Sequence, residues 1–214
     1  MKENYKGYTI KITNDDTDLD PRVENDNMCT MFCFHKRYRL GDYKLKVDID
    51  YTKYNSWDEV KEYFLMKEDI ALIKPLYLYD HSGITISTSP FDCQWDSGQI
   101  GFIFVTKKDI RENFGKKKIT KELLKKAEKI MDAEVKEYDN YLLGNVFRYD
   151  IYDEDENPVD SCCGYICDSE EDLWKDLKGE IESIIDSDIK NKEEEKQEKL
   201  DKEKFLMYSF DVIS

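Results

Sequence analysis

The chain has 214 residues, a formal net charge of −15 and an isoelectric point near 4.7. This charge repels nucleic acid and anionic membranes, so it argues against direct nucleic-acid binding by the chain. The sequence has no apolar run of about 18 residues and no secretory pattern at its start, so we expect a cytoplasmic protein without a membrane span.

Alternating and apolar runs in the first half of the chain predict strands at residues 5–12, 28–34, 44–50, 70–79 and 84–87. A polar, acidic loop at 14–27 separates the first two. Ser56 and Glu59 form a capping box, which predicts the start of a short helix. Asp80–Gly83 is expected to be a hairpin turn, because Gly83 accepts a positive φ.

The second half begins with an apolar run at 100–105, which predicts a central strand. A short helix should end at Gly115, and a longer one should run from Thr120 to Gly144. A second hairpin is expected over 145–165. The last helix should open at Ser169, and the charged run from Lys190 to Lys204 is either a solvated part of it or a disordered connector.

These elements predict an α+β fold. We expect an antiparallel or mixed sheet with two or three packed helices and a charged C-terminal helical extension. The expected division is a core domain at 1–168 and an extension at 169–214, which ends in an apolar tail at 205–213.

One group of residues resembles a nucleophilic site. A cysteine nucleophile needs a base within hydrogen-bond reach and a third group to orient that base. His81 and Cys93 lie twelve residues apart across a hairpin and a loop, and either Asp80 or Asp96 could orient the imidazole. The alternative is structural: the polar side chains satisfy the loop's own amides, and Trp95 fills it as a hydrophobic plug.

Metal and cofactor sites are not expected. Cys29 and Cys33 have a spacing that zinc accepts, but they flank a predicted strand, which separates the two sulfurs. The spaced carboxylates of Asp16, Asp18 and Asp20 lack the glycine and the glutamate that a calcium loop requires.

Three acidic segments are candidate partner-binding sites. Their carboxylates could imitate the phosphates of a nucleic acid and bind an arginine-rich groove, although solubility alone would also explain them. The candidate residues are Asp15, Asp16, Asp18, Asp20, Asp153, Glu154, Asp155, Glu156, Glu193, Glu194 and Glu195. The one basic stretch, at 116–129, lacks interleaved aromatic residues and is interpreted as a solvated helix face.

Five strings of residues resemble those of a family of small acidic proteins carried by phages and mobile elements. They are Cys33–Tyr38, Leu76–Gly83, Trp95–Phe102, Tyr138–Gly144 and Asp160–Gly164, so the resemblance covers roughly residues 5 to 165. The family as a whole has no settled biochemical function, and the strings are family markers, not catalytic signatures. The resemblance implies a setting in an infected bacterial host cell.

Charge and resemblance together favour an anti-defence protein, and the most specific version of this hypothesis is an anti-CRISPR. Such a protein would act as a nucleic-acid mimic and block a basic surface of a host effector, for example a CRISPR nuclease or a restriction enzyme. Two alternatives stay open: a hydrolase that uses His81 and Cys93, and a phage structural or assembly adaptor that binds its partner through the C-terminal helix.

Overall fold

The computed structural model describes residues 1–42, 49, 53–93 and 95–211, which form two compact units. Met1–Thr17 and Val146–Ser214 make up one unit, here called the terminal unit. Asp18–Asn145 makes up the other, called the central unit. The described residues contain five helices and two antiparallel sheets, which confirms the predicted α+β fold. The division differs from the one expected at residue 168, and most of the strand predicted at 44–50 lies outside the described residues.

The terminal unit is a four-stranded sheet covered on one face by a long helix. The sheet has the order β1-β2-β7-β8 and consists of β1 (Lys2–Tyr5), β2 (Tyr8–Asn14), β7 (Val146–Tyr152) and β8 (Pro158–Ile166). Alternating residues of β2 and β7 point to the helix side, which buries Ile10, Ile12 and Ile151. They pack against Ile181 and Ile185 of α5 (Glu170–Asp211).

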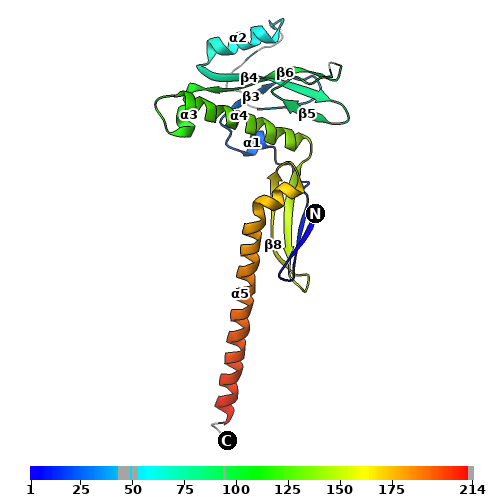
Figure 1. Cartoon of the computed structure of the whole chain (residues 1–214), viewed down its shortest axis with the longest axis vertical. Coiled ribbons are helices and arrows are strands. Elements are labelled where there is room, and N and C mark those ends of the chain that lie inside the picture. Colours follow the sequence, from blue (N-terminus) through cyan, green and yellow to red (C-terminus); the bar gives the residue numbers. More distant parts are fainter. Residues whose placement is uncertain (43–48, 50–52, 94, 212–214) are drawn as a thin grey trace. The chain divides into compact units, whose positions relative to one another are not determined.

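Helix α5 continues well past this core. Its packed part ends near Ile189, and every side chain from Lys190 to Phe205 is exposed. Figure 1 shows the helix extending beyond the β7–β8 hairpin of its own unit. Of the two interpretations of the charged run, the structure therefore shows the solvated helix.

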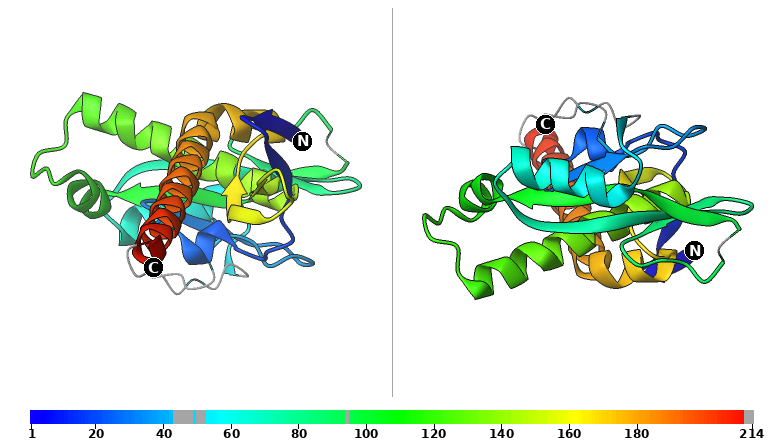
Figure 2. Two further views of the ribbon diagram at one scale, coloured as in Figure 1. Left: turned by 90° about the horizontal axis from the view of Figure 1, so that it is seen from below. Right: turned by 90° about the horizontal axis from the view of Figure 1, so that it is seen from above.

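The central unit places helices on both faces of its sheet. The sheet has the order β3-β6-β4-β5, with β3 (Thr30–Cys33), β4 (Ile70–Asp80), β5 (Ile84–Ser87) and β6 (Ser97–Thr106). Helix α4 (Lys121–Leu142) covers one face and α2 (Trp57–Lys67) the other (Figure 1). This explains why β6 is apolar on both faces. Figure 2 shows β4 and β6 running side by side through the unit.

Two short helices complete the central unit, α1 (Pro21–Glu24) and α3 (Lys107–Phe114). Helix α1 lies in the segment predicted as a loop. At Gly101 the strands β3 and β6 approach so closely that a Cβ atom would lie 1.8 Å from the carbonyl oxygen of Phe32, so only glycine fits. Among the helices that the structure describes, none has the length and apolar character needed to cross a bilayer.

Candidate functional site

The negative charge of the chain is concentrated in one unit. Residues 1–17 and 146–214 contain 12 lysine and arginine residues and 25 aspartate and glutamate residues, a net charge of −13. Residues 18–145 contain 21 lysine and arginine residues and 23 aspartate and glutamate residues, a net charge of −2. The field of the protein is therefore strongly negative around the terminal unit and close to neutral in sum around the central unit.

The turn between β7 and β8 carries the densest group of carboxylates. Asp153 accepts hydrogen bonds from the backbone N–H groups of Asp155, at 3.0 Å, and Asn157, at 2.8 Å, which fixes the turn. The Lys192 ammonium and the Asn157 N–H lower the pKa of Asp153 to about 2. The neighbouring Glu154, Asp155 and Glu156 are exposed. The turn therefore presents three exposed carboxylates on a fixed backbone.

Helix α5 supplies further carboxylates beside this turn. Nζ of Lys192 lies 2.8 Å from Asp153 and 2.9 Å from Asp188. Asp188 also accepts a hydrogen bond of 2.7 Å from the Tyr8 hydroxyl, which is the main reason that its pKa is lowered. Asp186 pairs with Lys6 at 2.9 Å. The acidic surface is defined here as Glu154, Asp155 and Glu156 together with Asp186 and Asp188.

The two halves of α5 differ in charge. The packed half, Glu170–Ile189, has eight acidic and two basic side chains, whereas Lys190–Lys204 has six of each. Glu193, Glu194 and Glu195 are exposed, as a contact would require, but the lysines around them cancel their charge. Lys190, for example, lies 3.5 Å from Glu194. The exposed extension is therefore neutral in sum, and the acidic field comes from the body of the unit.

The aspartates of the first loop are mostly used to hold the fold. Asp15 accepts hydrogen bonds from Thr17 and from the Gly164 N–H, and Asp18 accepts one of 2.6 Å from the Tyr141 hydroxyl. Asp20 is buried and caps the N-terminus of α1. Asp16 is exposed. The loop also spans the division between the units, with Asp15 and Asp16 on one side and Asp18 and Asp20 on the other.

Asp96 brings the two candidate catalytic residues together. It lies 3.3 Å from Nδ1 of His81 and accepts a hydrogen bond of 3.7 Å from the thiol of Cys93. A nucleophilic triad needs the imidazole in the middle, between thiol and carboxylate. Here the carboxylate occupies the middle position, and the His81 side chain is 64% exposed. The geometry fits a polar group that fixes the loop better than it fits an activated thiol.

The loop around these residues is ordered by its own hydrogen bonds. The Ser97 hydroxyl donates to the Cys93 carbonyl, and the Asp80 N–H donates to the Asp96 carbonyl at 2.8 Å. The proposal that Trp95 plugs this loop is wrong, because its side chain points outward and the residue is 96% exposed.

Three of the five phage-like strings meet at this end of the central sheet. Arg37 and Tyr38 of the first string contact the carboxylate of Asp80 in the second. His81 in the second contacts Asp96 in the third. The first string is about 40 residues from the second, and His81 is 15 residues from Asp96, so segments from three parts of the sequence form one polar cluster at the β4–β5 hairpin.

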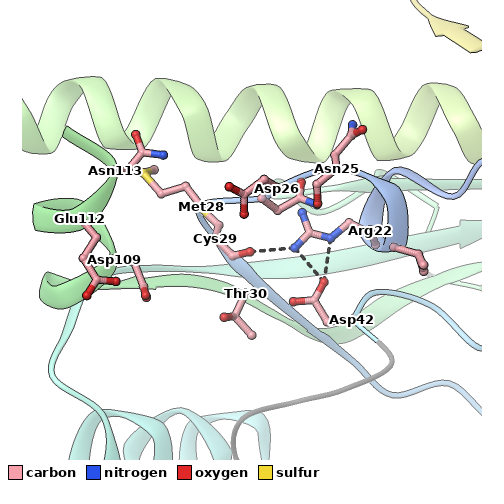
Figure 3. A pocket seen from close by; sticks show the side chains of 12 residues that line it. Arg22, Asn25, Asp26, Met28, Cys29, Thr30, Asp42, Asp109, Glu112 and Asn113 are labelled. Atoms are coloured by element: carbon pink, nitrogen blue, oxygen red, sulfur yellow. Dashed lines mark hydrogen bonds and ion pairs between the residues drawn. The ribbon is translucent and has the colours of Figure 1, made fainter. Parts of the chain in front are cut away.

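A pocket of about 680 Å³ opens in the central unit beside α1 and α3 (Figure 3). The Arg22 side chain at its base is 1% exposed, and its guanidinium donates to Asp42, Glu134 and the Cys29 carbonyl. Burial raises the pKa of the Cys29 thiol far above its usual value, so the thiol stays protonated and unreactive. The charged groups at the base satisfy one another, which indicates a structural role.

Sequence reasoning missed the buried ion pairs of Arg22 because the partners are distant in the chain. Glu134 accepts from Arg22 at 2.9 Å across 112 residues, and it also accepts from the backbone N–H groups of Met28 and Cys29. No local pattern signals such a pairing. Among the described residues, no three His, Cys, Asp or Glu side chains are placed to hold a metal ion.

Comparisons of the chain with models of protein families, with curated proteins and with solved structures find no match.

Proposed function

We propose that this protein is a stoichiometric inhibitor of a host defence effector, such as a CRISPR nuclease or a restriction enzyme. It binds a basic, nucleic-acid-binding surface of the effector through the acidic surface of the terminal unit. The observation that carries the proposal is the charge distribution: −13 of the net charge of −15 belongs to that unit. The resemblance to phage proteins supplies the biological setting.

The fixed geometry of the turn supports binding over mere solubility. Charges placed only for solubility need no common orientation, whereas Asp153 and Lys192 hold Glu154, Asp155 and Glu156 on one ordered turn. Carboxylates held in advance lose little entropy on binding, and their mutual repulsion is relieved when they meet arginine or lysine side chains. Electrostatic attraction would also speed the encounter with a basic groove.

The experiment that tests this function is plaque formation on hosts that each carry one CRISPR or restriction system. We expect expression of the protein to rescue a restricted phage on one of these systems, and the purified pair to associate in a fixed ratio. Rescue at amounts far below those of the effector would indicate catalysis and count against occlusion. Failure on every host, with co-purification of virion proteins, would favour the assembly adaptor.

A further inference from the structure

Helix α4 carries a row of lysines along its exposed side. Lys121, Lys125 and Lys129 follow one another at intervals of four residues, Lys126 adjoins the row, and Lys116–Lys118 precede the helix in sequence. All of these side chains are exposed. Within the described part of the chain none of them forms an ion pair. The row Lys121, Lys125 and Lys129 is called the basic stripe below.

The basic stripe costs the helix stability. Like charges four residues apart on a helix repel each other, and cations near a helix N-terminus oppose the helix dipole. Glu122 in the first turn offsets part of this repulsion, whereas Glu128 lies 3.1 Å from Lys74 on β4. The repulsion that remains among the lysines is relieved when the stripe contacts an anionic surface.

A matching acidic row lies on α5 of the terminal unit. Asp172, Asp176 and Glu180 also follow one another at intervals of four residues. Asp172 pairs with Lys175 at 2.9 Å, whereas Asp176 and Glu180 are exposed and supply most of the charge of the row. Four residues of helix correspond to a rise of about 6 Å, so both rows present a charge at the same spacing. These three residues are called the acidic stripe below.

We infer that the protein associates with itself, with the basic stripe of one copy docked against the acidic stripe of a second copy. Such a contact joins two different surfaces and is therefore head-to-tail. A symmetric contact between terminal units would bring two net charges of −13 together, and a symmetric contact between basic stripes would oppose lysines to lysines. The head-to-tail contact instead places lysines opposite carboxylates. Self-association in this mode is thus the one that the charge distribution favours.

A nucleic acid fits the basic stripe less well. A phosphate backbone drawn to the lysines would also feel the negative field of the terminal unit. Stacking would add little, because Lys121–Lys129 contains no aromatic residue on which a base could lie. The carboxylates of a second copy satisfy the same lysines with the charge spacing already matched.

Sedimentation velocity on the purified protein tests the inference directly. In 50 mM salt we expect the sedimentation coefficient to rise with protein concentration, and in 500 mM salt we expect a monomer, because salt screens exposed charges. Two variants remove one stripe each: Lys125→Glu with Lys129→Glu, and Asp176→Lys with Glu180→Lys. Each alone should weaken self-association by about tenfold or more.

Mixing the two variants gives the decisive result. In the lysine variant both stripes are acidic, and in the carboxylate variant both are basic, so neither variant should associate with itself. The intact acidic stripe of the first variant can still dock against the intact basic stripe of the second. We expect the equimolar mixture to regain association. The control matched to the lysine variant is Lys196→Glu with Lys199→Glu on the exposed part of α5, which makes the net charge more negative by the same amount and should leave association unchanged. Far-ultraviolet circular dichroism checks that every variant is folded.

Three outcomes would overturn the inference. A monomer at all concentrations in low salt would do so, as would association that the stripe variants do not alter. The third is a monomer that binds a labelled single-stranded oligonucleotide and loses this binding with Lys125→Glu and Lys129→Glu. That result would assign the basic stripe to nucleic acid.

Discussion

Nζ of Lys192 lies 2.8 Å from a carboxylate oxygen of Asp153, and this contact joins α5 to the turn of the β7–β8 hairpin. The same ammonium group lies 2.9 Å from Asp188, so one lysine holds two carboxylates from different elements. The three exposed carboxylates at 154–156 consequently keep a defined place beside the helix. The proposed contact with a basic surface depends on this fixed arrangement.

The Asp153 contact predicts a pH dependence. The pKa of Asp153 is lowered from 3.8 to about 2 in the folded protein, so the contact stabilises the fold fully above pH 4 and is lost as the pH falls toward 2. The difference in unfolding free energy between the wild type and Asp153→Asn should shrink across that window, as measured by urea denaturation. A carbon-13 titration of the Asp153 carboxyl should show its pKa returning toward 3.8 in Lys192→Met. A difference that stays constant with pH would contradict this role.

The buried ion pair of Arg22 predicts a large effect on stability. Replacing Arg22 with methionine leaves the carboxylates of Asp42 and Glu134 without their partner, which should cost about 3–5 kcal/mol. Arg37→Met is the matched control: Arg37 pairs with Asp80 but is 67% exposed, so the cost should be about 0–1 kcal/mol. Adding Glu134→Gln to the Arg22 variant should recover part of the loss. Equal effects of the two arginine variants in chemical denaturation would refute the structural role.

Local signals in the sequence predicted the hairpin at Asp80–Gly83 and the helix that opens at Thr120, whose hydroxyl accepts from the Leu123 N–H. The division into units was beyond such signals. It depends on β2 pairing with β7, for example Ile10 opposite Ile151, and alternation shows that a run is a strand without showing its partner.

The same distinction applies to the candidate site. Composition identified the acidic turn at 153–156, because a dense group of charges is visible in any sequence. It gave no sign that Asp18 accepts a hydrogen bond from Tyr141 or that Asp20 caps the N-terminus of α1. It also gave no sign that Asp96 would stand between His81 and Cys93, since three-dimensional order within a loop depends on contacts that residue spacing does not encode.

The exposed half of α5 is predicted to be dispensable for folding. Side chains from 193 to 205 are exposed, so a chain that ends at Lys192 should keep its unfolding free energy within about 0.5 kcal/mol. Ile185 lies about two turns before Lys192, in the packed half of the helix. Ile185→Ala should lower the unfolding free energy by about 2–5 kcal/mol, because that side chain is fully buried. A truncated chain as unstable as the Ile185 variant would show that the extension packs on the fold.

His81 and Cys93 are predicted to be unnecessary for inhibition. His81→Ala and Cys93→Ala should inhibit the effector at the same molar ratio as the wild type, because both side chains contact Asp96 and help to order the loop. Asp96→Asn should lower stability by about 1 kcal/mol, because it weakens contacts to both partners. Loss of inhibition in a folded His81 or Cys93 variant, with turnover by the wild type at catalytic amounts, would establish the hydrolase instead.

The most direct test of the acidic surface is displacement of nucleic acid from the effector that the plaque assay identifies. Labelled nucleic acid bound to that effector is titrated with the wild type and with Glu154→Lys, Asp155→Lys and Glu156→Lys combined. The matched control reverses Glu193, Glu194 and Glu195 in the neutral extension. We expect the wild type to displace the nucleic acid at a fixed ratio, the turn variant to lose this displacement, and the control to differ little from the wild type. Full displacement by the turn variant would contradict it.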